Sequence, residues 1–164
     1  LGSLHDRLSE MGKDLLLETL PNIISGNINP IKQDEAEVTY GYNITKEDEK
    51  IDFTKTSTEV DNKVRALNPT PGAYTTLNGK RMKVYDVRLS DRYYAKTEPG
   101  TIVGFEKDGI RVVTGDKEII LTDIALEGKK RCLVKDFLNG VDKKELLGVV
   151  LKWKKKRKKK KINI

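Results

Sequence analysis

Five short runs rich in Val, Ile, Thr and Tyr follow one another between residues 73 and 123. Turn sequences separate them, and two of these, Asn78-Gly79 and Asp108-Gly109, are typical of β-hairpins. The runs are residues 73–77, 81–89, 101–105, 110–114 and 118–123. Because an open sheet of short antiparallel strands leaves its edges exposed, this pattern predicts a small antiparallel barrel, mainly β with flanking helices.

The flanking helices are predicted from apolar residues at helical spacing. An amphipathic helix is expected before residue 26, where four apolar residues share one face: Leu4, Leu8, Met11 and Leu15. Nothing nearby in the sequence covers this face, so we expect it to pack against a neighbouring domain. Residues 27–45 show no helical periodicity and are expected to form an extended linker. A second helix is expected, with Ser57 or Thr58 as its N-cap and Asn68-Pro69 at its end, and a short last helix is expected over residues 132–138.

The positive charge of the chain is concentrated at its carboxy-terminal end. There are 32 basic and 25 acidic residues, and nine of the ten residues from Lys152 to Lys161 are basic. Without those nine the remainder has 23 basic and 25 acidic residues, a net charge of −2. This tail would attract any polyanion. Alternatively, it is a solvated stretch of charged residues without a binding role. A nucleic-acid function therefore requires support from the folded part.

Residue types that carry catalysis are scarce. The chain has one histidine, His5, and one cysteine, Cys132, so neither a disulfide within the chain nor a Cys/His metal site is expected. Arg131 lies beside Cys132 and is expected to lower the pKa of the thiol. Without a histidine partner, however, a nucleophilic role is not indicated. These features favour a binding module in a reducing, cytoplasmic environment, with no membrane segment.

Five blocks of sequence, in order, resemble methionyl-tRNA formyltransferase. SLHDRL with LLLETLP resembles the last helix of that family's catalytic domain, and VTY with ITKED and IDF resembles its linker. VRALNPTPGAYT resembles the start of its carboxy-terminal barrel, and GKK and DFLNG resemble its closing motifs. These blocks lie at residues 3–8 and 15–21, 38–53, 64–75, 128–130 and 136–140.

The resemblance implies a domain organisation. Residues 1–26 would be a helix remnant of the catalytic domain and 27–45 the linker. Residues 46–151 would be the OB-like barrel that holds tRNA through its backbone, and 152–164 a basic tail outside the family pattern. The helix remnant would dock on the missing catalytic domain.

The resemblance also implies a function. The family transfers a formyl group from 10-formyltetrahydrofolate to initiator methionyl-tRNA in the bacterial cytoplasm. Its catalytic and folate-binding motifs would precede residue 1, so no catalytic or cofactor-binding residue is expected here, and we expect the chain alone to be inactive. Two other interpretations stay open: a fragment of a related formyltransferase or formyl-folate hydrolase, and a free-standing nucleic-acid-binding OB module.

Six basic residues inside or beside the family blocks are candidates for neutralising tRNA phosphates. They are Lys46, Arg65, Lys80, Arg81, Lys129 and Lys130. Each is alternatively a solvated surface charge, and for Arg65 a structural ion pair is an equal alternative. Four tyrosines are candidates for stacking on bases, although strand aromatics are more often core residues. These are Tyr74, Tyr85, Tyr93 and Tyr94.

Overall fold

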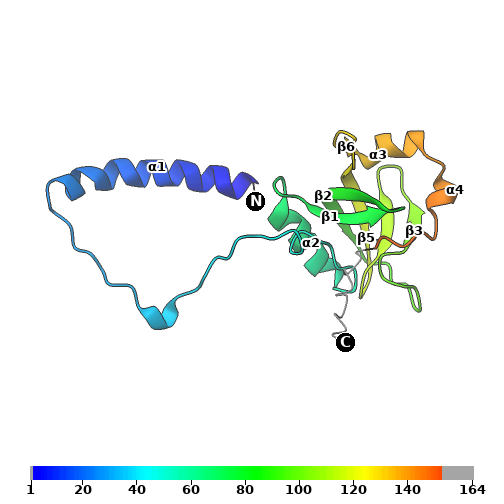
Figure 1. Ribbon diagram of the computed structural model, residues 1–164, viewed down its shortest axis with the longest axis horizontal. Helices are drawn as coiled ribbons and strands as arrows, with labels where there is room; N and C mark the ends of the chain where they lie inside the picture. Colours follow the sequence, from blue (N-terminus) through cyan, green and yellow to red (C-terminus); the bar gives the residue numbers. More distant parts are fainter. Residues whose placement is uncertain (1, 153–164) are drawn as a thin grey trace, which may run out of the picture. The chain divides into compact units, whose positions relative to one another are not determined.

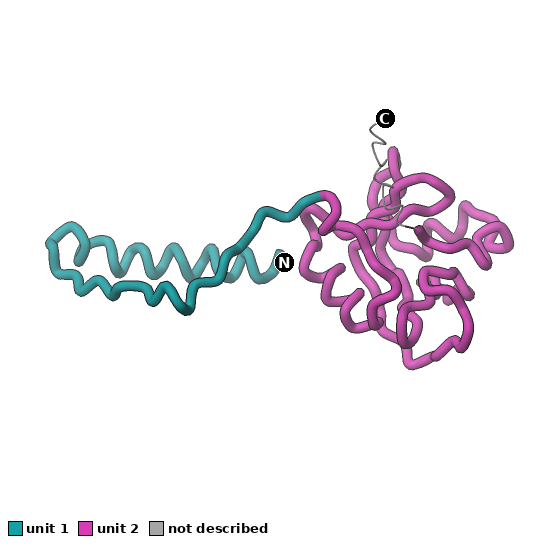
Figure 2. The backbone as a smooth tube through the Cα atoms, turned by 60° about the horizontal axis from the view of Figure 1, so that its bottom comes forward, with its two compact units in different colours: residues 1–45 teal, residues 46–164 magenta. Residues whose placement is uncertain are grey.

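A computed structural model describes residues 2–152, and the chain divides into two compact units, Leu1–Thr45 and Lys46–Ile164 (Figure 2). The first unit consists of α1 (Gly2–Ile24) and a segment whose one regular element is the 3-10 turn η1 (Glu35–Glu37). Helix α1 continues through Pro21, and its apolar side chains, including Leu4 and Leu15, remain exposed. Among the described residues, no helix is long and apolar enough to cross a membrane.

The second unit is built on one antiparallel sheet (Figure 1). Its strands lie in the order β1 (Ala73–Leu77), β2 (Lys80–Ser90), β5 (Glu118–Leu126), β4 (Ile110–Val113) and β3 (Ile102–Phe105). A short strand, β6 (Cys132–Leu133), also pairs with β5. The predicted fold class, mainly β with flanking helices, is therefore confirmed.

The two edges of the sheet do not pair with each other directly. Instead, residues 148–152 run between them. Ile102 N donates to Val149 O at 2.9 Å and Leu151 N to Gly100 O at 2.8 Å, while Lys152 N donates to Thr76 O at 3.2 Å. At Gly100 (φ 91°) a Cβ atom would lie 2.7 Å from Leu151 O, so a larger residue would push this segment away. The arrangement is barrel-like, with a bridging segment in place of a direct strand pair.

Strand β2 begins at the Asn78-Gly79 hairpin, where both residues have positive φ (48° and 81°), as the sequence predicted. Met82 and Val84 are fully buried, so the alternate residues Arg81, Lys83 and Tyr85 face outward. The β2–β5 register shifts between Val84 and Val87, and this bulge changes which residues of the strand face the core.

Helix α2 (Ser57–Leu67) packs on β1 and β2 through three buried residues: Val60, Val64 and Leu67. Its N-cap is Thr56, which forms a capping box with Glu59, so the expected cap at Ser57 or Thr58 was one or two residues late. The expected helix over residues 132–138 was also wrong in part. Cys132–Leu133 pairs with β5 as β6, and only then follow α3 (Val134–Phe137), η2 (Leu138–Gly140) and α4 (Lys143–Leu146).

Candidate nucleic-acid interface

Outward-facing residues of β2 and β5 line a groove of about 360 Å³, which we call the basic groove. Its cations come from three places: Arg81 and Lys83 on β2, and Lys129 from the turn after β5. The remaining lining residues are Tyr85, Ala125, Leu126 and Glu127. Glu127 is the one acid in this lining, so the groove carries an excess of positive charge.

Hydrogen bonds hold the two sides of the basic groove in register. Glu127 N donates to Arg81 O at 2.8 Å, and the side chain of Glu127 accepts from Arg81 N at 3.1 Å. Lys129 N donates to Leu126 O at 2.8 Å and closes the turn after β5. The start of β2 and the Gly128-Lys129-Lys130 turn are therefore fixed beside each other.

Two arginines cover tyrosine rings next to this groove. The guanidinium carbon of Arg81 lies 4.1 Å from the ring centre of Tyr74, and that of Arg131 lies 4.2 Å from the ring centre of Tyr85. Asp123 accepts from Arg131 Nε (2.9 Å) and Nη2 (2.7 Å), and this carboxylate raises the pKa of Arg131 above its ordinary value. Stacking holds Arg81 in a defined orientation, which favours recognition of phosphate oxygens, whereas Arg131 is already paired with Asp123.

Two lysines near β1 are held by neighbouring groups: Lys83 and Lys50. Lys83 Nζ donates to Pro71 O at 2.6 Å, so the loop before β1 positions its ammonium group. Lys50 pairs with Tyr74 as a parallel bridge at the edge of β1. Its Nζ donates to Glu47 at 2.6 Å, and this bond raises the pKa of Lys50. Lys50 is therefore part of an ion pair rather than an open anion site.

Of the six predicted residues, Arg81 and Lys129 line the basic groove together. Lys80 and Lys130 are their exposed neighbours in sequence, at the start of β2 and in the turn after β5. Lys46 is exposed in the turn that leads to Lys50, next to β1. Arg65 differs, because its Nε donates to Asp61 at 3.0 Å within α2. The ion pair that the sequence allowed for Arg65 is thus present.

Lys83 and Arg131 were not among the residues predicted from the sequence. The signal for Lys83 was available, since Arg81, Lys83 and Tyr85 alternate on a predicted strand and so share one face. Arg131 carried no such signal. Its position over Tyr85 depends on the pairing of β5 with β6, which the sequence predicted as helix.

Three of the four candidate tyrosines are not open for base stacking. Tyr74 is buried under Arg81, and Tyr85 is half-buried under Arg131. Tyr94 is half-buried, and its hydroxyl accepts a hydrogen bond from Arg111. Tyr93 is the exception, with an exposed fraction of 71%.

Covalent or metal chemistry has no support among residues 2–152. Burial raises the pKa of the Cys132 thiol, and the neighbouring Asp136 and Asp123 raise it further, so the expected lowering by Arg131 was wrong. The Arg131 guanidinium is bound to Asp123 instead. His5 is exposed on α1 beside Asp6. No group of three His, Cys, Asp or Glu side chains suited to a metal ion lies within this described range.

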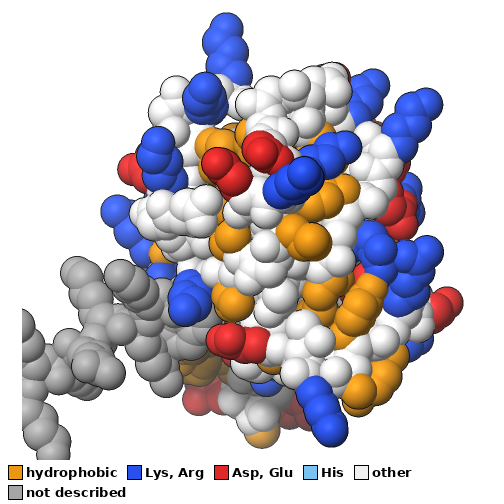
Figure 3. Space-filling view, turned by 90° about the vertical axis from the view of Figure 1, so that its right-hand side faces the viewer, with side chains coloured by type: hydrophobic (Ala, Val, Ile, Leu, Met, Phe, Trp, Pro, Cys, Tyr) orange, Lys and Arg blue, Asp and Glu red, His pale blue; other side chains and the backbone are white. Residues whose placement is uncertain are grey.

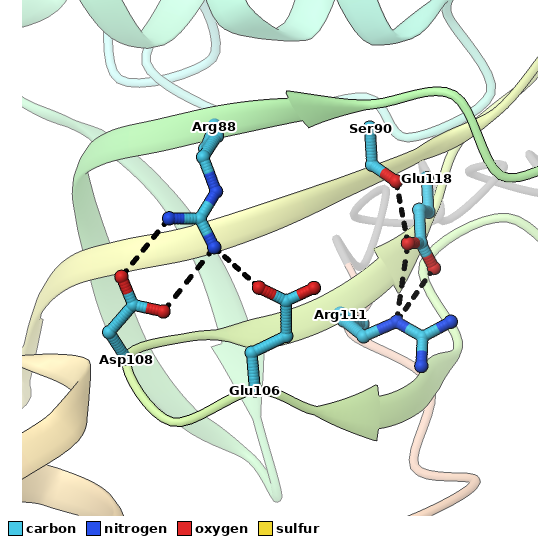
Figure 4. A network of polar contacts seen from close by, with 6 residues as sticks. All are labelled: Arg88, Ser90, Glu106, Asp108, Arg111 and Glu118. Atoms are coloured by element: carbon cyan, nitrogen blue, oxygen red, sulfur yellow. Dashed lines mark hydrogen bonds and ion pairs between the residues drawn. The ribbon is translucent and has the colours of Figure 1, made fainter.

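Other surfaces of the second unit differ in character. The face that carries α3 and α4 shows a band of apolar side chains with Lys and Arg scattered around it (Figure 3). Leu133, directly before α3, and Leu147, directly after α4, are exposed large apolar residues of this unit. At the far end of β2, arginines are matched by carboxylates: Arg88 with Asp108 and Glu106, and Arg111 with the buried Glu118 (Figure 4).

The sequence of this chain is similar to that of known formyl transferases. The sequence model described as "Formyl transferase, C-terminal domain" matches residues 43–142. The methionyl-tRNA formyltransferase of Bacillus velezensis is 50% identical over 143 residues, which are 85% of this chain and 44% of the relative. That of Streptococcus agalactiae is 43% identical over 148 residues, 90% of this chain and 47% of the relative. The chain thus spans less than half the length of these relatives and matches their carboxy-terminal portion.

Solved structures show the same fold at low sequence identity. HypX from Aquifex aeolicus, crystallised in complex with tetrahydrofolic acid, matches with a TM-score of 0.57 and 21% identity. The match covers 78% of this chain and 23% of the HypX chain. A similarity at this level supports the fold alone.

Proposed function

This chain belongs to the formyl transferase C-terminal domain family, and we propose that its barrel binds the backbone of initiator methionyl-tRNA. The proposed role is to hold the tRNA for a formyltransferase that uses 10-formyltetrahydrofolate in the bacterial cytoplasm. In this proposal residues 1–26 dock on the catalytic domain and residues 27–45 form the linker. The barrel of residues 46–151 supplies the RNA contacts.

The observation that carries the proposal is the basic groove. Arg81 and Lys129, chosen from the sequence, line one groove together with Lys83. Phosphate contacts by Lys and Arg provide most of the non-specific affinity for nucleic acids. Because Arg81 and Arg131 cover the nearest tyrosine rings, this groove offers cations rather than open aromatic faces. It therefore suits a folded RNA, whose phosphates lie outside and most of whose bases are paired.

Substituting the groove cations tests the proposal. The background is the full chain with its nine basic residues between Lys152 and Lys161 replaced by Ser, which we call the tail-neutral chain. In this background, the double substitution Arg81→Gln/Lys129→Gln is expected to weaken tRNA binding at every salt concentration. The negative slope of log affinity against log salt concentration should become less steep by about 1.5–2. This corresponds to roughly 0.9 for each duplex phosphate that is no longer neutralised. Fluorescence anisotropy with a labelled tRNA, from low to moderate KCl, measures both effects.

Lys135→Gln/Lys144→Gln is the matched control. It removes the same charge from exposed positions on α3 and α4. The control should keep the slope of the tail-neutral chain to within about half a unit, because these lysines lie outside the basic groove. Equal losses from the two double variants would show that overall charge decides binding, and the groove would lose its proposed role.

A further inference from the structure

The loop that follows β2, residues 91–99, is fixed to the sheet at both sides of one residue, Tyr93. On one side, Glu118 N donates to Arg92 O at 3.0 Å, and Lys117 Nζ donates to Asp91 at 2.7 Å. On the other side, the Tyr94 hydroxyl accepts a hydrogen bond from Arg111. The backbone around Tyr93 is therefore held although the residue itself lies at the surface.

The anchor on the Tyr94 side is a buried polar network (Figure 4). Glu118 is fully buried, and its two carboxylate oxygens accept from Arg111 Nε at 3.2 and 3.0 Å. Ser90 Oγ donates to the same carboxylate at 2.8 Å. Arg111 is thus held in place by Glu118, and it in turn fixes Tyr94, the neighbour of Tyr93.

Tyr93 has the properties of a stacking residue. It is 71% exposed, whereas the other three tyrosines of the second unit lie under guanidinium groups: Tyr74, Tyr85 and Tyr94. Arg92 and Lys96 are exposed in the same loop, and their side chains form no ion pair with any described residue. An open aromatic ring flanked by cations is typical of surfaces that stack on bases beside a phosphate backbone. The acids of this loop are Asp91, which is paired with Lys117, and the exposed Glu98.

We propose that Tyr93 stacks on an unpaired base of the bound RNA, with Arg92 and Lys96 contacting the adjoining phosphates. This inference rests on the proposed function and adds a second contact to it. Strand β2 has 11 residues, so the loop lies about 35 Å along the strand from the start of the basic groove. A folded RNA of tRNA size is long enough to reach both, which a short single strand in the groove is not.

Substitutions at Tyr93 in the tail-neutral chain test the inference. Tyr93→Ala is expected to weaken binding of a tRNA transcript about 5- to 100-fold, the range typical of losing one aromatic–base stack. Its salt slope should stay unchanged, because no charge is removed. Tyr93→Phe should bind like the parent, since it keeps the ring. Leu147→Ala is the control, because it truncates another exposed apolar side chain, next to α4. Circular dichroism checks that each variant is folded.

A fully paired RNA hairpin with a minimal closing loop serves as the second probe. Its binding should be insensitive to Tyr93→Ala, because it offers no unpaired base within reach. The inference is overturned if Tyr93→Ala changes tRNA binding less than twofold, or if the hairpin loses as much affinity as the tRNA. It is also overturned if Tyr93→Phe is as damaging as Tyr93→Ala. If groove substitutions weaken binding while Tyr93→Ala does not, only this inference fails, and the proposed function stands.

Discussion

Replacing Glu118 with Gln is expected to lower the free energy of unfolding by about 3 kcal/mol, near the low end for breaking a buried ion pair. Glu118 is fully buried, and its partner Arg111 has only 15% of its side chain exposed. Gln keeps the shape and the acceptor for Ser90, but it leaves the Arg111 charge without its counterion. The remaining exposure of Arg111 limits the loss. Urea unfolding of the full chain measures it.

Two further variants separate the buried charge from general effects of substitution. Arg88→Gln removes a cation that pairs with Asp108 and Glu106 on the same sheet, but 48% of its side chain is exposed. Arg88→Gln should lower the free energy of unfolding much less than Glu118→Gln does, because exposed ion pairs contribute little to stability. Glu118→Leu/Arg111→Met should recover much of the stability lost in Glu118→Gln, since both charges are gone. Equal losses in Arg88→Gln and Glu118→Gln would contradict the assignment of Glu118 as a buried charge that needs Arg111.

The second large effect concerns the tail. In the tail-neutral chain, the slope of log RNA affinity against log salt concentration is expected to be several units less steep than in the full chain. Each phosphate that the tail no longer neutralises accounts for about 0.7–0.9 of this change. The nine basic residues removed leave 23 basic and 25 acidic residues, so general attraction to polyanions disappears. Affinity for a single-stranded RNA should fall most, because general charge attraction supplies a larger share of its affinity than it does for a folded tRNA. Parallel salt titrations of tRNA and of a single strand of equal length measure both changes.

The tail-neutral chain should still prefer the folded tRNA over the single strand. Its positive charge is then local, since Arg81, Lys83 and Lys129 remain together in the basic groove. A chain that loses detectable tRNA binding at low salt along with its tail would contradict an independent RNA surface on the barrel.

Local sequence patterns were sufficient to predict strands β1 to β5, but not β6. Hairpin pairs such as Asn78-Gly79 set strand ends through backbone preferences, and alternating apolar residues set the buried face. The amphipathic spacing of α2 likewise gave its buried residues. These signals act over a few residues, so they can be read without knowing the pairing of distant strands.

Features that depend on distant pairing were not predictable in this way. The bridging segment 148–152 is defined by hydrogen bonds to Gly100, Ile102 and Thr76, far away in the sequence. The cover of Tyr85 by Arg131 follows from the β5–β6 register. The thiol of Cys132 was misjudged because proximity in sequence to Arg131 says nothing of where that guanidinium points. The basic residues could be listed from the sequence. Which of them line one groove depends on the register of β2 with β5, which the sequence did not show.

Protection of lysines by tRNA tests the central claim most directly. The tail-neutral chain is treated with acetic anhydride with and without saturating tRNA, and mass spectrometry gives the acetylation of each lysine. We expect tRNA to protect Lys80, Lys83, Lys129 and Lys130, which lie in or beside the basic groove. Lys135, Lys143 and Lys144, on α3 and α4, should react as in the free protein. Protection of the α3–α4 lysines with full reactivity in the groove would place the RNA on another face and contradict the account.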